Sequence, residues 1–172
     1  MPRLSRSSDG KSKTLKEQSN PPVPFDSIKI GMRATHTKII RESDITSFAQ
    51  ISGDFNPLHF DDEYASEMGF EKRIAHGMIS SSLFSGLFGT KLPGPGCLFI
   101  SQSFKYKKPV YVGDTITAEI LVESVNSNRR VVGFLTTCKK NDEIVVSGDA
   151  KLFVPKSQSS KKDQATSEKS FG

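Results

Sequence analysis

The stretch MISSSLFSGLF, from Met78 to Phe88, decides the fold. Its apolar residues are separated only by serines and one glycine, so a helix formed here would have no strongly polar side. The small residues also let neighbouring elements approach the helix closely. We therefore expect a buried central helix rather than a helix on the surface.

The chain on the C-terminal side of this helix changes to a period of two. Apolar or small residues alternate with the other face through four stretches, 98–106, 116–122, 132–138 and 144–154. This is the pattern of strands with one buried face. Turn-forming residues separate the strands at 112–114, 126–128 and 141–142. The sequence thus predicts an α+β fold, with an antiparallel sheet wrapped around a central helix.

The segment on the N-terminal side of the central helix predicts two short helices. The first covers residues 43–51, because Ser43 or Asp44 can cap it and its apolar residues recur at helical spacing. Residues 52–57 break it, since Gly, Asn and Pro favour turns. The second covers residues 61–68, with acids in its first turn.

The length of 172 residues suits one domain, and the excess positive charge lies at its two ends. Residues 1–20 carry a net +3 and residues 156–172 a net +2, which account for the formal +5 of the chain. A nucleic-acid-binding protein would carry this charge on a folded face, so we expect no nucleic-acid partner. No stretch has the roughly 18–20 apolar residues of a membrane span, so we expect no membrane partner.

Composition divides the chain into three parts. Residues 1–24 are predicted to be a basic flexible tail that ends in a stiff proline-rich linker, residues 25–155 the domain, and residues 156–172 a second basic tail. The first eight residues hold two Arg, three Ser and no acid, which is the chemistry of a mitochondrial targeting segment. We expect a mitochondrial protein, with the cytoplasm as the alternative.

The two cysteines, Cys97 and Cys138, lie far apart and lack the paired spacing of a zinc site. We expect two reduced thiols, partly buried, in a reducing compartment. We expect neither a metal nor a cofactor.

A carboxylate and an imidazole flank a rigid turn in the stretch SGDFNPLH, residues 52–59. Asn56-Pro57 favours extended geometry, which would let Asp54 and His59 face each other across the turn. Such a pair can hold one water and move two protons, as hydration of a double bond requires. On residue types alone, an Asx turn beside a surface histidine is an equally open interpretation.

The stretch Ile74-Ala75-His76-Gly77-Met78 leads directly into the predicted central helix. A glycine at a helix start offers an unobstructed backbone N–H at the positive end of the helix dipole. Gly77 therefore suits an oxyanion donor for a thioester carbonyl, although a plain helix-start glycine is the alternative. For His76 we favour a histidine bonded locally to hold the turn over a catalytic one.

These residues resemble a known family. The run SGDFNPLH, with Phe48 before it and Ala65 after it, looks like the signature of the MaoC-like, (R)-specific enoyl hydratases. The similarity covers residues 29–155 and is concentrated in four further stretches, 75–78, 83–86, 92–96 and 108–114. Residues 87–97 also resemble the mitochondrial 3-hydroxyacyl-thioester dehydratases of fatty acid synthesis.

The resemblance implies a hot-dog fold, usually a homodimer, with a substrate tunnel near the subunit interface. It implies reversible conversion of a (3R)-3-hydroxyacyl thioester, carried by CoA or by acyl carrier protein, to the trans-2-enoyl thioester and water. Asp54 and His59 match the catalytic pair of the family, and Gly77 its oxyanion donor. The substrate-binding positions implied are Asn56, Ser85, Phe88 and Val110, and for the last three core packing is an equally open role.

Other functions stay open on the same residues. The runner-up on the same chemistry is an (R)-specific enoyl-CoA hydratase of fatty acid degradation. A hot-dog thioesterase would direct water at the carbonyl carbon instead. A protein that only binds acyl thioesters is disfavoured by the intact acid and base. Four cations could meet CoA phosphates or an acidic carrier, although solvated strand-edge lysines are favoured: Arg73, Lys105, Lys107 and Lys108.

Overall fold

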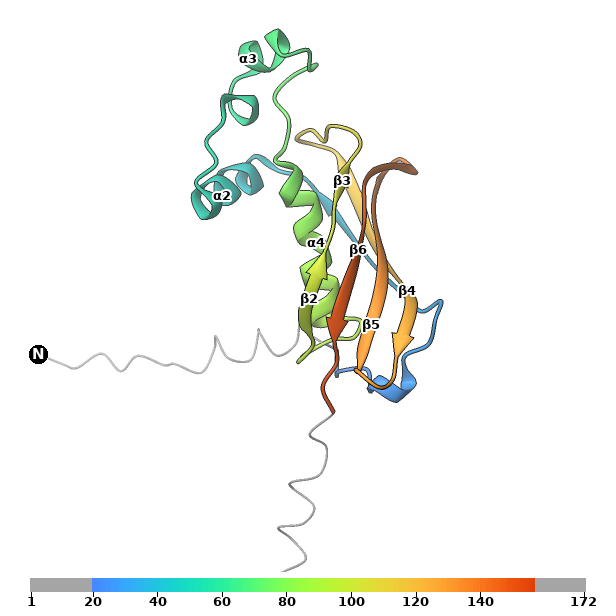
Figure 1. Ribbon diagram of the computed structural model, residues 1–172. Coiled ribbons are helices and arrows are strands. Elements are labelled where there is room, and N and C mark those ends of the chain that lie inside the picture. The colour runs from blue at the N-terminus through green and yellow to red at the C-terminus, as the bar shows by residue number, and fades with distance from the viewer. Residues whose placement is uncertain (1–19, 157–172) are drawn as a thin grey trace, which may run out of the picture.

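A six-stranded antiparallel sheet packs against one long helix in the computed structural model, which describes residues 20–156 (Figure 1). The helix is α4, Gly77–Thr90. The hydrogen-bonded strand order is β1-β4-β5-β6-β2, and β3 pairs with β6 off this path. The strands are β1 (Arg33–Ile39), β2 (Leu98–Gln102), β3 (Lys105–Tyr106), β4 (Thr115–Asn126), β5 (Val131–Lys140) and β6 (Glu143–Phe153). The predicted α+β architecture is confirmed. Residues 1–19 and 157–172, which hold the predicted targeting segment and most of the two predicted tails, lie outside the described residues.

The buried face of the sheet follows the alternation in the sequence. Every second residue of β4 from Ile116 to Val122 is buried, and β5 buries Val132, Phe134 and Cys138. Phe88 of α4 is fully buried, and its ring centroid lies 4.9 Å from that of Phe134. Burial of each such large apolar side chain is worth about 1.5–3 kcal/mol, so this cluster supplies the main apolar stabilisation.

The strand connections have the turn chemistry that the sequence indicates. Asn141 and Asp142 join β5 to β6 with φ angles of 47° and 66°, and two consecutive positive φ angles are what a type I′ hairpin turn requires. Arg130 in the β4–β5 connection also has a positive φ, 53°. The predicted turns at 126–128 and 141–142 are confirmed.

The two edges of the sheet differ from the prediction. Residues 33–39, for which no strand was expected, form β1 and pair with β4. Most side chains of β1 are exposed, so it lacks the apolar alternation that marks a half-buried strand. At the other edge, the predicted strand 98–106 is divided into β2 and β3, and β2 exposes the apolar side chains of Leu98, Phe99 and Ile100.

Residues 41–76, which we call the arm, project beyond the end of α4 and the sheet (Figure 1). The arm carries α2 (Glu42–Ser52), the 3-10 turn η2 (Pro57–His59) and α3 (Asp62–Glu67). Both predicted short helices are therefore confirmed.

The ends of the arm helices are set by polar residues. The Arg41 N–H donates to Asp44 Oδ2 at 2.9 Å, and Asp61 Oδ1 accepts from the Glu63 and Tyr64 N–H groups. Gly53 ends α2 with a φ of 77°, a left-handed conformation that favours glycine. These local signals place the next residue, Asp54, just beyond a rigid helix end.

The proline-rich stretch 20–24, predicted as a linker, runs along the C-terminal end of α4. The Asn20 N–H donates to Thr90 O at 3.1 Å, and the Val23 N–H donates to Pro93 O at 2.8 Å. The short 3-10 helix η1 (Phe25–Ser27) follows, with Phe25 buried. Across the described residues, none of the helices combines the length and the apolar character needed to cross a membrane.

Candidate active site

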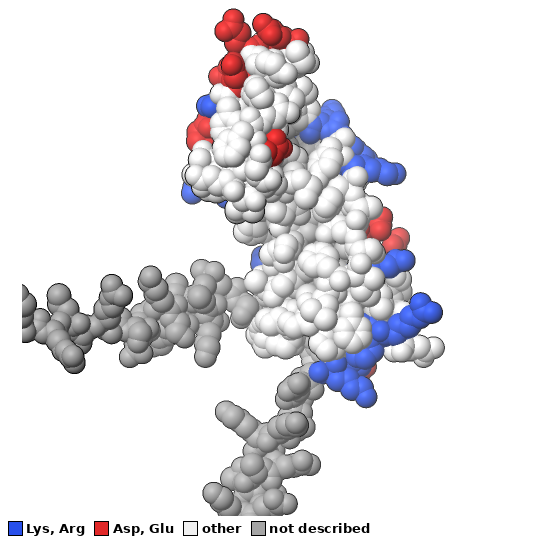
Figure 2. Space-filling model, turned by 60° about the vertical axis from the view of Figure 1, so that its left-hand side comes forward, with Lys and Arg blue, Asp and Glu red and all other residues white. Residues whose placement is uncertain are grey.

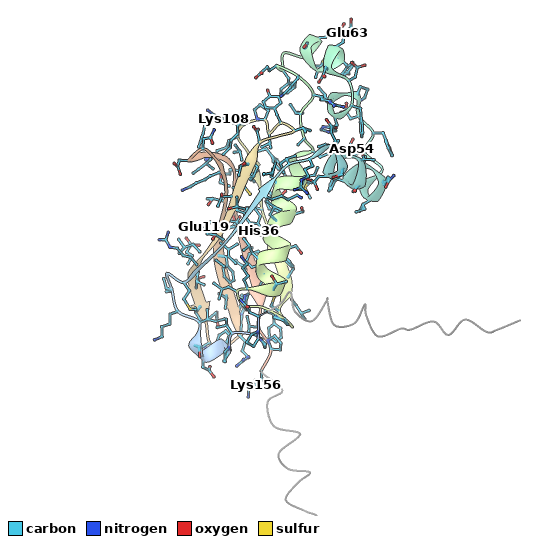
Figure 3. All side chains as sticks on the ribbon, turned by 180° about the vertical axis from the view of Figure 1, so that it is seen from behind. His36, Asp54, Glu63, Lys108, Glu119 and Lys156 are labelled. Carbon is cyan, nitrogen blue, oxygen red and sulfur yellow. The ribbon has the colours of Figure 1, made fainter. Side chains whose placement is uncertain are left out.

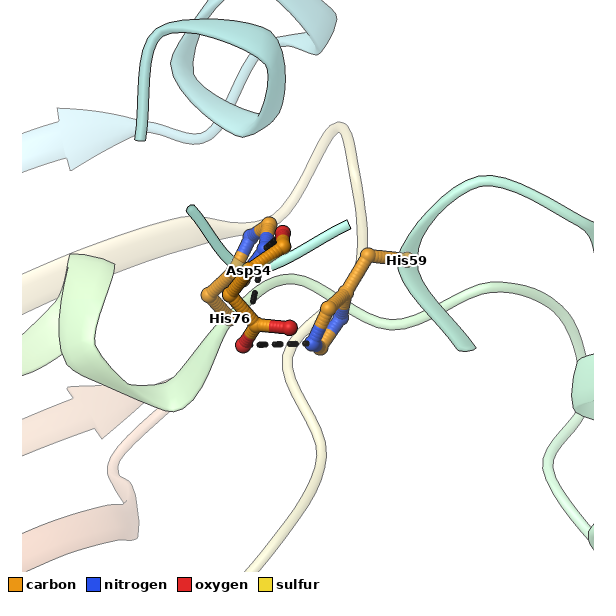
Figure 4. Close-up of side chains that lie close together, drawn as sticks. All are labelled: Asp54, His59 and His76. Atoms are coloured by element: carbon orange, nitrogen blue, oxygen red, sulfur yellow. Dashed lines mark hydrogen bonds and ion pairs between the residues drawn. The ribbon is translucent and has the colours of Figure 1, made fainter. Parts of the chain in front are cut away.

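Asp54 lies in the exposed turn that follows α2. Its Oδ1 accepts the Asn56 N–H at 3.2 Å, so the Asx turn considered from the sequence is present. The rest of the side chain is free to interact, since it is 48% exposed and its Oδ2 points toward two imidazole rings (Figure 4). The carboxylate therefore has one oxygen that holds the turn and one that faces the site.

His59, the last residue of η2, is buried rather than a surface histidine. Its Nδ1 lies 2.8 Å from the carbonyl oxygen of Ile74. Because a carbonyl oxygen only accepts, Nδ1 carries the proton, and the neutral ring has its lone pair on Nε2. That Nε2 lies 3.8 Å from Asp54 Oδ2, and the structure thus brings the sequence-predicted pair together.

The separation of the pair suits one shared water. At 3.8 Å the two atoms are too far apart for a direct hydrogen bond. A water oxygen about 2.8 Å from each atom would lie between them at normal hydrogen-bond distances. Such a water would face one carboxylate oxygen and one imidazole lone pair, both of which accept protons.

The protonation of His59 depends on its surroundings. Burial, the largest effect, lowers the pKa of His59 below its ordinary value, and the neighbouring His76 lowers this pKa further. The bond to Ile74 and the Asp54 carboxylate raise the pKa of His59 without cancelling the burial effect. His59 is therefore a neutral base at pH 7.

His76 completes the cluster (Figure 4). Its Nε2 donates to the backbone oxygen of Asp54 at 2.9 Å and lies 3.9 Å from Asp54 Oδ2. The bond connects residues 22 positions apart, so His76 holds a turn, as expected, but one that is distant in sequence rather than local. The signal available from sequence was only its place beside Gly77.

Gly77 is the first residue of α4, and its N–H donates to no acceptor within residues 20–156. A Cβ atom at Gly77 would lie 2.9 Å from Cδ1 and Cε1 of the Tyr106 ring, so a side chain does not fit there. Gly77, Tyr106 and Val110 line one cavity of about 450 Å³. The free N–H and the cavity make this helix start a suitable place for a carbonyl oxygen.

Comparison with known proteins identifies this arrangement. Residues 24–143 match the family model described as MaoC like domain. The chain belongs to the MaoC-like family. It is 44% identical over 131 residues to an (R)-specific enoyl-CoA hydratase of Rhodospirillum rubrum, with 76% of this chain and 91% of the relative covered.

Two further relatives of the MaoC-like chain agree with this assignment. A protein of Arabidopsis thaliana named mitochondrial 3-hydroxyacyl-[acyl-carrier-protein] dehydratase is 37% identical over 134 residues, which cover 74% of this chain and 78% of the relative. The solved (R)-hydratase of Aeromonas caviae has 38% identity and a TM-score of 0.72, over 75% of this chain and 98% of that one. The predicted hot-dog fold is confirmed.

The expected substrate-binding residues of the MaoC-like chain fall in different places. Val110 is buried and lines the cavity beside Gly77. Ser85 is exposed on α4, and Phe88 packs between the rings of Phe99 and Phe134. Asn56 Oδ1 accepts the N–H of the residue at position 58 and so caps η2. Val110 therefore lies in the same cavity as the start of α4, whereas the contact of Asn56 is the cap of η2.

The basic residues near the site of the MaoC-like chain are partly neutralised. Arg73 Nη2 lies 2.5 Å from Glu42 Oε1, and Lys108 pairs with Glu143. Acidic side chains gather at the tip of the arm, and Lys and Arg side chains lie on the neighbouring face (Figure 2). Lys107 and Lys108 line the cavity beside Gly77, and Figure 3 shows Lys108 at the same end of the molecule as Asp54.

The same cluster has the residue types of a metal site. Asp54, His59 and His76 each offer one possible ligand atom, and these atoms lie within 4.8 Å of one another. However, His76 Nε2 donates its proton to Asp54 O, so it has no lone pair for a cation. The hydrogen bonding leaves two ligands facing each other, an arrangement that suits a shared water better than a coordinated ion.

Proposed function

We propose that the protein is a hydro-lyase that interconverts a (3R)-3-hydroxyacyl thioester with the trans-2-enoyl thioester and water. The observation that carries this proposal is the 3.8 Å approach of Asp54 Oδ2 to an unprotonated Nε2 of His59. The free Gly77 N–H at the start of α4 provides the matching oxyanion donor. The names of the relatives, hydratases and dehydratases of acyl thioesters, support the same chemistry.

In the hydration direction, the shared water forms a C–O bond with the β-carbon while His59 Nε2 takes one of its protons. The electron pair of the double bond moves toward the thioester carbonyl, whose oxygen becomes negative and accepts the Gly77 N–H. The resulting enolate takes at the α-carbon the one proton that the Asp54–His59 pair removed from the water, so the pair returns to its starting protonation. One water is thereby added on one face of the double bond, and dehydration runs the same steps in reverse.

Crotonyl-CoA tests this reaction against a thioesterase. We expect purified protein to remove the enoyl absorbance without releasing free thiol. Release of thiol at the rate of substrate loss would instead assign hydrolysis at the carbonyl carbon. Neither change, at enzyme concentrations comparable to substrate, would point to a protein that only binds acyl thioesters and would reject the proposed activity.

We propose that the physiological step is the dehydration in mitochondrial fatty acid synthesis. Two relatives named mitochondrial dehydratases, from Arabidopsis thaliana and Solanum lycopersicum, support it at 37% and 33% identity. The Arg- and Ser-rich first residues agree with import. An (R)-specific enoyl-CoA hydratase is the second candidate, favoured by the 44% identity to the protein of that name.

The carrier distinguishes these two roles. A dehydratase of fatty acid synthesis should convert (3R)-hydroxyacyl carrier-protein substrates with a higher kcat/KM than the matching CoA thioesters, at several chain lengths. A preference for CoA thioesters would favour the hydratase. A fluorescent fusion of the full chain should co-localise with mitochondria, and a fusion that begins at residue 20 should not.

We also propose that the protein works as a homodimer. Strand β2 lies at an edge of the sheet and exposes apolar side chains, including Leu98 at 61% and Ile100 at 54%. An unpaired apolar edge associates readily with another strand. Light scattering should give twice the 18.9 kDa of one chain. Ile100→Lys should give monomers, whereas Ile30→Lys, at a residue exposed outside the sheet, should not.

A further inference from the structure

His76 contacts both members of the proposed catalytic pair and is joined to the oxyanion donor. It is the N-cap residue of α4 and directly precedes Gly77. Its Nε2 donates to Asp54 O at 2.9 Å, and its ring centroid lies 3.7 Å from that of His59, with 31° between the planes. One residue therefore joins the three groups, two through its side chain and Gly77 through the backbone.

The position of the His76 ring is determined by its packing. The residue is 2% exposed. Phe48 of α2 approaches it with a centroid distance of 5.0 Å and Phe60 with 6.3 Å. Its Nδ1 is buried and has no hydrogen-bond partner among the described residues. The bond that Nε2 donates to Asp54 O is therefore the hydrogen bond that holds the ring among the described residues.

Asp54 has little else to hold it in place. The turn around it is exposed, and its other hydrogen bonds are local, to Ser52 Oγ and from the Asn56 N–H. The bond from His76 is the long-range hydrogen bond of Asp54 within residues 20–156. Without it, Asp54 would have no hydrogen bond within residues 20–156 to a residue more than two positions away.

The ring contact also bears on the charge of His59. The charge interaction with His76, whose ring centroid lies 3.7 Å away, is one of the causes that lower the pKa of His59. The other charged group at this cluster is Asp54, 3.8 Å from His59 Nε2. Phe48 and Phe60, from the packed elements of the arm, carry no charge.

We infer that His76 is a positioning residue: it fixes Asp54 through the Nε2–H bond and holds the His59 ring in place through the ring contact. The inference rests on the proposed hydratase function for its kinetic consequence. A displacement of a catalytic group by about 1 Å can cost roughly 10²-fold in rate, so a hydrogen bond to the backbone of Asp54 has a measurable effect on kcat.

Two variants distinguish the effect of the His76 hydrogen bond from the effect of the His76 ring. His76→Phe keeps a flat ring but loses the N–H donor, and it should lower kcat about 10- to 100-fold with little change in KM. His76→Gln keeps an N–H donor at similar reach but loses the ring, and it should return kcat to within about tenfold of the wild type. In both, the acidic limb of the pH–rate profile should move to higher pH, because the pKa of His59 loses the lowering effect of its neighbour.

An NMR titration of the His59 ring measures the same effect without activity. A higher His59 pKa in the Gln variant than in the wild type supports the inference even if the wild type proves inactive, a result that rejects only the proposed reaction. A purely structural residue would lower the melting temperature in both variants and leave the His59 titration unchanged. That outcome, or wild-type kcat in the Phe variant, overturns the inference. Should the Phe variant not fold, the titration of the Gln variant decides.

Discussion

The core formed by the sheet and α4 differs from the arm in what holds it together. The core buries a continuous apolar cluster that includes Phe84, Phe88 and Phe134. The arm contributes few buried apolar side chains and is connected by polar contacts. Arg73 pairs with Glu42 at 2.5 Å and with Asp62 at 3.7 Å within the arm, and Lys38 of β1 pairs with Asp44 of the arm at 2.9 Å.

The core therefore supplies most of the stability, and the arm places the residues of the site. Burial of apolar area is strong and non-directional, so it can hold a sheet on a helix without placing any one atom accurately. Exposed ion pairs contribute little stability, but hydrogen bonds have direction. The arm uses them to place Asp54 and His59 beside the start of α4. Substitutions in the two regions should therefore affect different measurements.

The largest expected effect is on the stability of the core. Phe134→Ala removes a fully buried ring that packs on Phe88 and should lower the free energy of unfolding by about 3–5 kcal/mol. Denaturant titration measures this, with Leu135→Ala, a half-exposed neighbour on β5, as the control. The molecules that remain folded should keep a kcat close to that of the wild type. Equal losses of unfolding free energy in Phe134→Ala and Leu135→Ala would contradict the view that the buried core supplies the stability.

The second effect is on the chemistry of the site. Asp54→Asn and His59→Ala should each lower kcat/KM roughly 10²-fold or more, because each removes a proton-transfer group. Asp54→Asn should keep a melting temperature near that of the wild type, since the Asp54 side chain is 48% exposed. His59→Ala also removes a buried ring and leaves Ile74 O without its hydrogen bond, so its melting temperature should fall as well. His36→Ala, at an exposed histidine of β1 (Figure 3), is the control and should change neither quantity. Near-normal turnover in either site variant would disprove the assigned pair.

A smaller effect is expected where the arm meets the core. In Gly77→Ala the new Cβ would lie 2.9 Å from the Tyr106 ring, so the ring or the helix start must shift, and kcat should fall about tenfold or more. Gly86→Ala, on the same helix with no atom within 4 Å of the new Cβ, should keep its activity and gain about 0.5–1 kcal/mol of stability. Identical kinetics in the two variants would show that the start of α4 is not close to the reacting atoms.

The smallest effect is a shift in pH dependence. Burial lowers the pKa of His59, so the acidic limb of kcat/KM should lie below about pH 6.5, the ordinary histidine value. The lowered pKa of His59 also makes the free energy of unfolding rise with pH. The stability that His59 contributes is fully present above its unfolded-state pKa and is lost as the pH falls through its folded-state pKa. In the His59→Ala variant, the free energy of unfolding should lose this part of its dependence on pH. An acidic limb of kcat/KM above pH 6.5 would show that His59 does not act as a buried neutral base.

Local patterns were sufficient for most of the fold. The four-fold recurrence of alternating residues after position 96 and the small-residue helix 78–88 are each set by neighbours in sequence, and a period of two or a helical face needs no distant partner to be visible. Strand β1 was missed because its side chains are mostly exposed at an edge. The exposed apolar face of β2 was not foreseen either, since alternation does not tell which strand lies at an edge.

Only part of the site could be predicted from the sequence. Asp54 and His59 are five positions apart, and the turn chemistry between them indicates that they can meet. The contact of Tyr106 with Gly77 joins a strand to a helix 29 positions earlier. No rule of spacing predicts such a contact, because it depends on how β3 is placed against α4.

By itself, the sequence determined the helix and strand types, the turns, and the carboxylate and imidazole of the proposed reaction, because each follows from the chemistry of residues close in the chain. Only the tertiary structure decided that Ile74 O binds His59 Nδ1, which leaves Nε2 unprotonated, and that His76 holds the backbone of Asp54. Those bonds form when the arm folds back onto the start of α4. Their direction, and hence the proton on each nitrogen, depends on three-dimensional geometry that no local pattern contains.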